Sequence, residues 1–197
     1  GGYALSLRLN FARTTKNVAI SFRGYLQGYW SNSKDLLQEF LQECSEIDLC
    51  DCFEYTIGKA ILVLENALYG GFRFPIDARM AGRTFTKFSI DMATGDAWIE
   101  PHEIIYPQNW LEFAGIESVK FPLISIEQQF AEKLHSFTLP RKKTNSRVKD
   151  IVDLIALINT DKLDIGKLEL AIKQTFIRRN THNLPSELPE IPYNWIA

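Results

Sequence analysis

The sequence has no long apolar run and no large excess of charge of one sign. No stretch of its 197 residues approaches the roughly 20 apolar residues that a membrane-spanning helix requires, and its first residues lack the charged-then-apolar layout of a signal peptide. The 22 basic and 24 acidic side chains give a net charge of -2, so no global positive charge indicates a nucleic-acid partner. We therefore expect a cytoplasmic protein with no membrane partner.

Cysteine is also scarce, and its placement limits what it can do. The three cysteines, Cys44, Cys50 and Cys52, lie in one short stretch, and their odd number fits reduced thiols better than a disulfide framework. A zinc site is the sharper alternative, but it needs a fourth ligand. The histidines of the chain are scattered without the spacing of metal ligands, which favours free thiols.

The residues that are present predict a mixture of helices and strands. A hydrophobic content of 46% is enough to build a sizeable core. Apolar periodicity predicts helices at 3–9, after a capping Ser33, and at about 125–137, 146–159 and 164–179, with strands at 17–23, 53–57, 60–64, 72–80 and 86–92. Helices and strands are partly segregated, so we expect an α+β fold with a sheet lobe over 1–122 and a C-terminal helical lobe over 123–197.

The N-terminal segment combines two glycines with the start of a strand. Gly1 and Gly2 precede the run Arg-Thr-Thr-Lys-Asn-Val-Ala-Ile at 13–20. Small residues let backbone N–H groups approach a phosphate, and the two-residue period of a strand turns Asn17 and Ala19 to the same side. Asp91 lies between two apolar residues of a later strand, so its side chain points away from them. Taken singly, these features also fit an ordinary turn and an ordinary strand end.

The helical half carries two motifs rich in ionisable residues. They read Glu-Gln-Gln-Phe-Ala-Glu-Lys-Leu-His at 127–135 and Arg-Val-Lys-Asp-Ile-Val-Asp-Leu at 147–154. Asp150 and Asp153 are three residues apart and share one helical face with apolar neighbours. Because acidic residues are seldom buried alone, Lys133 or Arg147 is expected to pair with one of them. Such a pair either ties two helices together or supports a catalytic lysine, and the two roles are compatible.

The order and spacing of these segments resemble the AbiEii/AbiGii toxin family of nucleotidyltransferases over nearly the entire chain. The resemblance implies a minimal nucleotidyltransferase-like mixed sheet and a reaction that uses Mg²⁺ and a nucleoside triphosphate. By the resemblance, Gly1, Gly2, Arg13 and Lys133 contact the nucleotide, and Asp91 is a metal-binding carboxylate. Asp150 or Asp153 orients that lysine or assists the attacking hydroxyl group.

One departure from the family pattern bears directly on activity. The family carries Asp-x-Asp where this sequence has Asn17 and Ala19. Two carboxylates on one side of a strand hold the metal ions that clamp the attacking and leaving oxygens, so their replacement is expected to lower the affinity for Mg²⁺ sharply.

A basic tract at 140–147, Pro-Arg-Lys-Lys-Thr-Asn-Ser-Arg, is the densest run of positive charge in the chain. It either contacts the phosphates of RNA or is a solvated loop. Arg178 and Arg179 either extend this patch or complement the dipole of the last helix.

Three functions remain open from the sequence. The first is a toxin of a bacterial toxin–antitoxin or phage-defence system that transfers a nucleotide to a tRNA-like RNA or a protein, with a separately encoded antitoxin. The second is a catalytically dead module that binds a nucleotide, RNA or protein, and the third is a structural protein without a ligand. The first two depend on one spatial expectation: Asn17, Ala19 and Asp91 lie side by side at the edge of the sheet and face Lys133 across a groove.

Overall fold

The computed structural model describes residues 1–9, 15–22, 33–63, 71–94, 97, 99–109, 111–141 and 147–190. It divides into two compact units, one of residues 1–96 and 105–121 and the other of residues 97–104 and 122–197. Each unit is described by itself below. The predicted α+β fold class is confirmed: a mixed sheet with helices forms the first unit, and helices dominate the second. The predicted lobes 1–122 and 123–197 stay a prediction.

The first unit is built on a five-stranded mixed sheet. Its strands run in the order β1-β5-β4-β2, with β3 pairing to β4; β1 pairs parallel to β5, and the other pairs are antiparallel. The elements of this unit are α1 (Gly2–Arg8), β1 (Asn17–Phe22), α3 (Lys34–Ser45), β2 (Phe53–Ile57), β3 (Leu62–Val63), β4 (Gly71–Met80), β5 (Arg83–Thr94) and the short 3-10 helix η1 (Glu112–Ala114).

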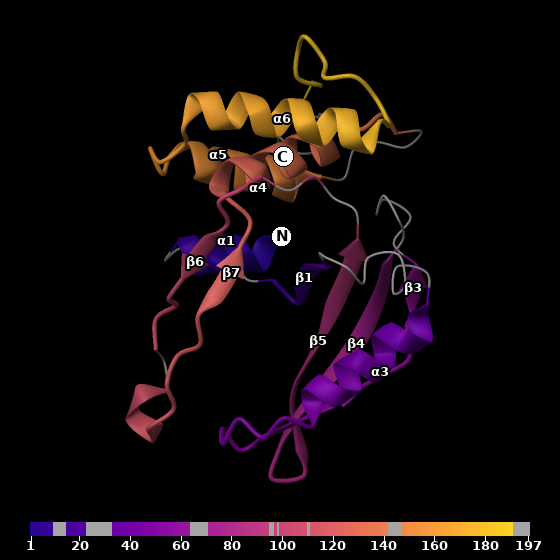
Figure 1. The fold of residues 1–197 in the computed structure, drawn as a ribbon, viewed down its shortest axis with the longest axis vertical. Helices are drawn as coiled ribbons and strands as arrows, with labels where there is room; N and C mark the ends of the chain where they lie inside the picture. The colour runs from indigo at the N-terminus through magenta and orange to yellow at the C-terminus, as the bar shows by residue number, and fades with distance from the viewer. Residues whose placement is uncertain are drawn as a thin grey trace. The chain divides into compact units, whose positions relative to one another are not determined.

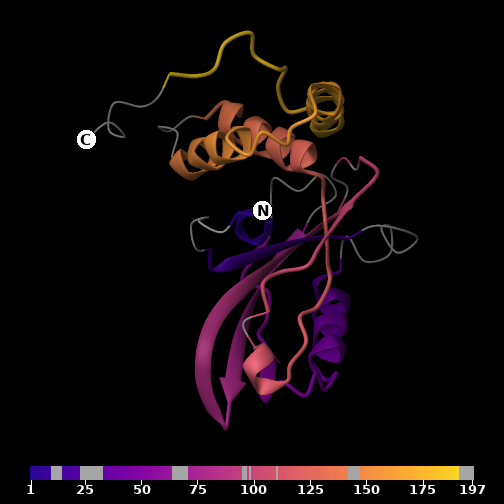
Figure 2. The same ribbon diagram turned by 90° about the vertical axis from the view of Figure 1, so that its left-hand side faces the viewer.

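Two strands dominate the sheet, and a turn with two left-handed residues joins them. β4 and β5 form a long, curved hairpin (Figures 1 and 2). Ala81 and Gly82 at its tip have φ angles of 49° and 73°, the left-handed conformation that two-residue hairpin loops require. A β-bulge between Ala78 and Arg79 shifts the register by one residue. The shift determines which residues of β4 and β5 are paired over the rest of the hairpin.

One face of the sheet is the core of the first unit. α3 begins after Ser33, whose hydroxyl accepts a hydrogen bond from the Leu36 N–H at 3.3 Å, as predicted. Its buried Leu37 and Leu41 pack against the apolar side chains of β4 and β5, namely Phe74, Ile76 and Met92. Because side chains alternate along a strand, the neighbouring residues of β4 and β5 project from the opposite face of the sheet.

The second unit consists mainly of three helices, α4 (Ile126–Thr138), α5 (Val148–Ile158) and α6 (Ile165–Arg179), with α4 packed against both others (Figure 2). Leu134, Leu154 and Phe176 supply one buried side chain from each helix. α4 is capped by Ser125, whose hydroxyl accepts from the Gln128 N–H at 3.1 Å. The Gln128 side chain does not bond back to Ser125 as a capping box would, because it donates to Glu132 and Thr175 instead.

The remaining differences from the predicted elements are small. The sequence predicts no helix or strand between 101 and 122, but this segment contains η1, β6 (Glu103–Ile105) and the start of β7 (Phe121–Leu123), which pairs with β6 in a two-stranded sheet. In α5 the two acids are buried, whereas the apolar Val152 and Ile155 are 50% and 54% exposed. No helix among the described residues is both long and apolar enough to cross a bilayer.

Candidate functional site

The sequence-predicted residues of the first unit meet on the polar face of the sheet. Ala19 of β1, Asp91 of β5 and Arg73 of β4 are register partners and form one row across three strands. Asn17 lies two residues away on β1, in the row that continues through Ser89. We call Asn17, Ala19, Arg73 and Asp91 the sheet cluster. The predicted juxtaposition of Asn17, Ala19 and Asp91 on the edge strand and its neighbour is therefore present in the structure.

Gly1 lies close to this row. A Cβ atom placed on Gly1 would come within 3.1 Å of the Ala19 Cβ, closer than side-chain contacts normally are. Any larger residue at position 1 would press on β1, so a glycine here lets the backbone approach the strand. Gly2 follows as the first residue of α1. Gly1 thus lies beside the sheet cluster, and the phosphate-binding role expected of the two glycines stays a prediction.

Asp91 forms an ion pair with an arginine of the neighbouring strand. The Arg73 Nε donates to Asp91 Oδ1 at 2.6 Å, and the Arg73 Nη2 donates to Asp91 Oδ2 at 2.7 Å, a bidentate pair with side chains 29% and 19% exposed. With its amide oriented to suit its neighbours, Asn17 accepts from Arg73 Nη2 at 3.2 Å and donates to the Lys16 carbonyl at 3.1 Å. The hydrogen bond with Asp91 raises the pKa of Arg73 above its usual value. Arg73 is the residue that the sequence analysis left without a role.

This donor set does not fit a divalent metal ion. Mg²⁺ requires several oxygen ligands in near-octahedral geometry, usually including one or two carboxylates. Both Asp91 oxygens are engaged by Arg73, the Asn17 oxygen is shared with the same guanidinium, and Ala19 has no donor atom. Across the described part of the chain, no group of three His, Cys, Asp or Glu side chains has the arrangement of a metal site. The three cysteines are exposed free thiols.

The sequence-predicted residues of the second unit form a separate buried ion-pair group. Lys133 of α4 donates a hydrogen bond to Asp153 of α5, and its Nζ is 3.6 Å from Asp150 Oδ1. Arg147 Nη1 is 3.7 Å from Asp150 Oδ2. We call Lys133, Arg147, Asp150 and Asp153 the helix cluster. The prediction that Lys133 or Arg147 pairs with one of the acids is confirmed.

Burial makes the helix cluster energetically demanding. The side chains of Lys133, Asp150 and Asp153 are 9%, 12% and 1% exposed. Moving a charged group out of water costs roughly several kcal/mol per ion. The attraction between the opposite charges offsets this cost. Each of these residues is thus held in place by the others, which fixes the position of the Lys133 ammonium group.

The two clusters belong to different units, so the groove expected between them stays a prediction. Arg13 and most of the basic tract, residues 142–146, lie outside the described residues. At the start of that tract, Arg141 donates to the Ser136 carbonyl at 3.0 Å. Arg179 Nη1 lies 3.4 Å from a histidine nitrogen, and whether Arg178 and Arg179 extend the basic tract or complement the dipole of α6 stays open.

That histidine belongs to a polar group that sequence reasoning missed. His135 of α4 is 3% exposed; its Nε2 is 2.9 Å from the Thr181 hydroxyl, and its Nδ1 is 3.4 Å from Arg179 Nη1. Thr138 and His182 bond to each other at 2.9 Å beside it. Since an arginine only donates, His135 is best satisfied as a neutral ring that accepts at Nδ1 and donates from Nε2. The Lys-Leu-His motif gave the histidine, but nothing local linked it to Thr181.

We predict that this histidine makes the protein lose stability in mild acid. Burial first, and then the charges of Arg179 and His182, lower the pKa of His135 from 6.5 to about 4. Burial also lowers the pKa of His182. A depressed histidine pKa means that the folded state resists protonation, so this contribution is complete above pH 6.5 and is lost as the pH falls toward 4. The expected loss is about 2 kcal/mol between pH 7 and pH 5.

Urea denaturation of the chain and of a His135→Gln variant at several pH values measures this. The variant should be less stable at pH 7.5 and should show a shallower decline in acid. Parallel declines for the two proteins would show that another group is responsible.

The comparisons with known proteins add one positive finding. A family model described as nucleotidyl transferase AbiEii toxin, type IV TA system, matches residues 1–196 of the chain. No curated protein matches it.

Proposed function

The chain belongs to the AbiEii family of nucleotidyl transferase toxins of type IV toxin–antitoxin systems. From that premise, we propose that it binds a nucleoside triphosphate but no longer catalyses metal-dependent nucleotide transfer. The observation that carries the proposal is the bidentate Arg73–Asp91 pair beside Ala19. In the family pattern these positions gather carboxylates around a metal. Here one carboxylate remains and a guanidinium neutralises it.

The nucleotide contacts are assigned as follows. Gly1, Gly2 and Arg13 approach the phosphates, and Lys133 contributes a positive charge to the triphosphate. Asp153 and Asp150 are positioning residues, because they hold the Lys133 ammonium group and its charge in one place. The close approach of Gly1 to β1 supports the first assignment, since backbone N–H groups bind phosphate only where no side chain intervenes.

The proposed partners follow from the family. A type IV toxin acts with a cognate antitoxin, which we expect to be encoded separately. The acceptor in active relatives would be an RNA, such as a tRNA, or a protein. For this chain we propose that the same cytoplasmic partners are bound and that the nucleoside triphosphate stays intact, with no transfer of its nucleoside monophosphate.

A second candidate is a transferase that is still active, and the helix cluster favours it. Lys133, Asp150 and Asp153 lie in the two segments that resemble the family's motifs, and the lysine contacts both acids. One oxygen of Asp150, Oδ2, is shielded from solvent and has no hydrogen-bond donor within the described residues, although Arg147 Nη1 lies 3.7 Å from it as an ion pair. Such an acceptor could receive the proton of an attacking hydroxyl group.

Isothermal titration calorimetry with nucleoside triphosphates distinguishes the two candidates. Titrations in Mg²⁺ and in EDTA are expected to give dissociation constants within about threefold of each other, because the sheet cluster supplies no carboxylate free to hold a metal. Binding that tightens tenfold or more with Mg²⁺ would favour the active transferase. No binding under either condition would reject nucleotide recognition altogether.

A further inference from the structure

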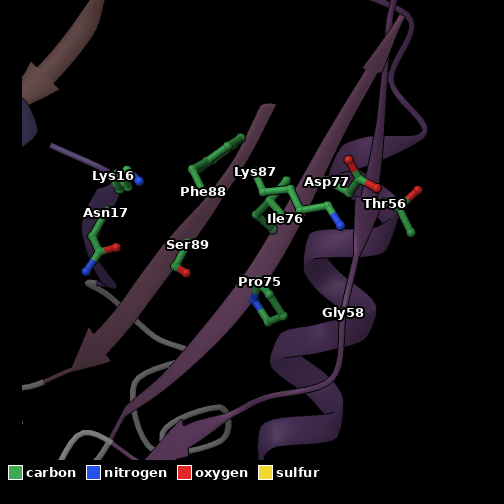
Figure 3. Close-up of a pocket in the computed structure, with 10 residues that line it drawn as sticks. All are labelled: Lys16, Asn17, Thr56, Gly58, Pro75, Ile76, Asp77, Lys87, Phe88 and Ser89. Carbon is green, nitrogen blue, oxygen red and sulfur yellow. The ribbon is translucent and has the colours of Figure 1, made fainter. Parts of the chain in front are cut away.

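The polar face of the sheet holds a pocket next to the sheet cluster. The pocket has a volume of about 390 Å³ and extends over β1, β5 and β4 (Figure 3). Asn17, Ser89 and Pro75 form one row of its lining, two residues along the strands from the Arg73–Asp91 row. Asn17 belongs to both features, because its side chain lines the pocket and contacts Arg73.

Two lysines give this pocket a positive charge. Lys87 of β5 and Lys16, which precedes β1, both line it, and neither has an ion-pair partner among the residues that the structure describes. The acid in the lining is Asp77, the cross-strand neighbour of Lys87. The lining therefore carries two cations against one anion, which favours an anionic ligand.

One carboxylate oxygen of Asp77 lacks a hydrogen-bond donor within the described residues. Its Oδ2 accepts from the Thr84 hydroxyl at 3.1 Å, whereas its Oδ1 is shielded from water and has no donor within the described residues. A buried acceptor without a donor is costly, and native proteins normally satisfy such groups. Asp77 lines the pocket, so a ligand N–H or O–H group that reaches this oxygen would satisfy it.

We infer that this pocket binds the nucleoside 5′-phosphate portion of a nucleotide without a divalent ion. Lys16 and Lys87 attract the phosphate, and Asp77 accepts a hydrogen bond from a sugar hydroxyl or a base amino group. Pro75 offers an apolar surface to the sugar or base. The volume is in the range, roughly 300–1,000 Å³, that ligand pockets usually have. This inference rests on the proposed function and assigns the nucleoside and its 5′-phosphate, not the outer phosphates, to one surface of the first unit.

Calorimetry on the full chain in EDTA, with AMP and ATP as probes, tests the assignment. Lys87→Ala and Asp77→Asn are each expected to weaken binding about tenfold, because each removes a charge-assisted contact. Lys34→Ala is the matched control, since Lys34 is an exposed lysine of α3 and does not line the pocket; it should leave the dissociation constant unchanged. Circular dichroism confirms that each variant is folded.

The outcomes separate the pocket from the proposed function. If nucleotides bind and both pocket variants bind like the control, the pocket assignment is wrong and the proposed function stands. If no nucleotide binds to the unaltered chain, both fail. Inorganic phosphate that binds as tightly as AMP would also overturn the assignment, because Asp77 would then have no nucleoside to recognise.

Discussion

Nucleotide transfer is expected to appear when the two replaced carboxylates are restored by the double substitution Asn17→Asp, Ala19→Asp. The unaltered chain should transfer no label from a radioactive nucleoside triphosphate, whereas the variant should transfer it in Mg²⁺ and not in EDTA. The new carboxylates would lie on one side of β1, with position 19 in register with Asp91. Bound metal stabilises such a transition state by several kcal/mol, so the gain should be about 10²-fold or more.

The controls for this gain use the same strand and the same ion pair. Ser21→Asp adds a carboxylate to an exposed position of β1 outside the Asn17–Ala19 pair and should not restore transfer. Adding Arg73→Gln to the double variant should raise transfer further, because it frees both oxygens of Asp91. Comparable transfer by the unaltered chain would mean that the carboxylates have been assigned to the wrong positions.

Asp153→Ala is expected to cost the second unit about 3–5 kcal/mol of stability, because it leaves the buried Lys133 ammonium group without its closest partner. Asp153 is 1% exposed and Lys133 is 9% exposed, so water cannot replace the lost carboxylate cheaply. Chemical denaturation followed by far-ultraviolet circular dichroism measures the change.

Two further variants separate the buried charge from general damage to α5. Lys149→Ala alters an exposed residue of the same helix and should change the stability by less than about 0.5 kcal/mol. Lys133→Met combined with Asp153→Ala removes both charges and should recover part of the loss. A cost below about 1 kcal/mol for Asp153→Ala alone would show that Lys133 is hydrated in solution, contrary to the buried pair.

Local sequence patterns predicted correctly those features that depend mainly on a single helix. Ser33 caps the helix that follows it, as its position before an apolar periodic segment predicted, and Ser125 caps α4 in the same way. The three-residue spacing of Asp150 and Asp153 predicted that they share one helical face, and in the structure both acids lie near Lys133. The same reasoning was less successful for the apolar residues of α5: Val152 and Ile155 are half exposed, because the acids take the inner face.

The sequence by itself determined the family, the α+β class and the replacement of two carboxylates by Asn17 and Ala19, since each follows from residue identity and from the short periods of helix and strand. Only the tertiary structure decided what faces Asp91. Continuing the register of the Met80–Arg83 pair would place Arg73 opposite Ile90, and the bulge at Ala78 and Arg79 moves it opposite Asp91 instead. A one-residue shift in register moves the side chains of a strand to the other face of the sheet. No local pattern in this sequence predicts the bulge that causes the shift.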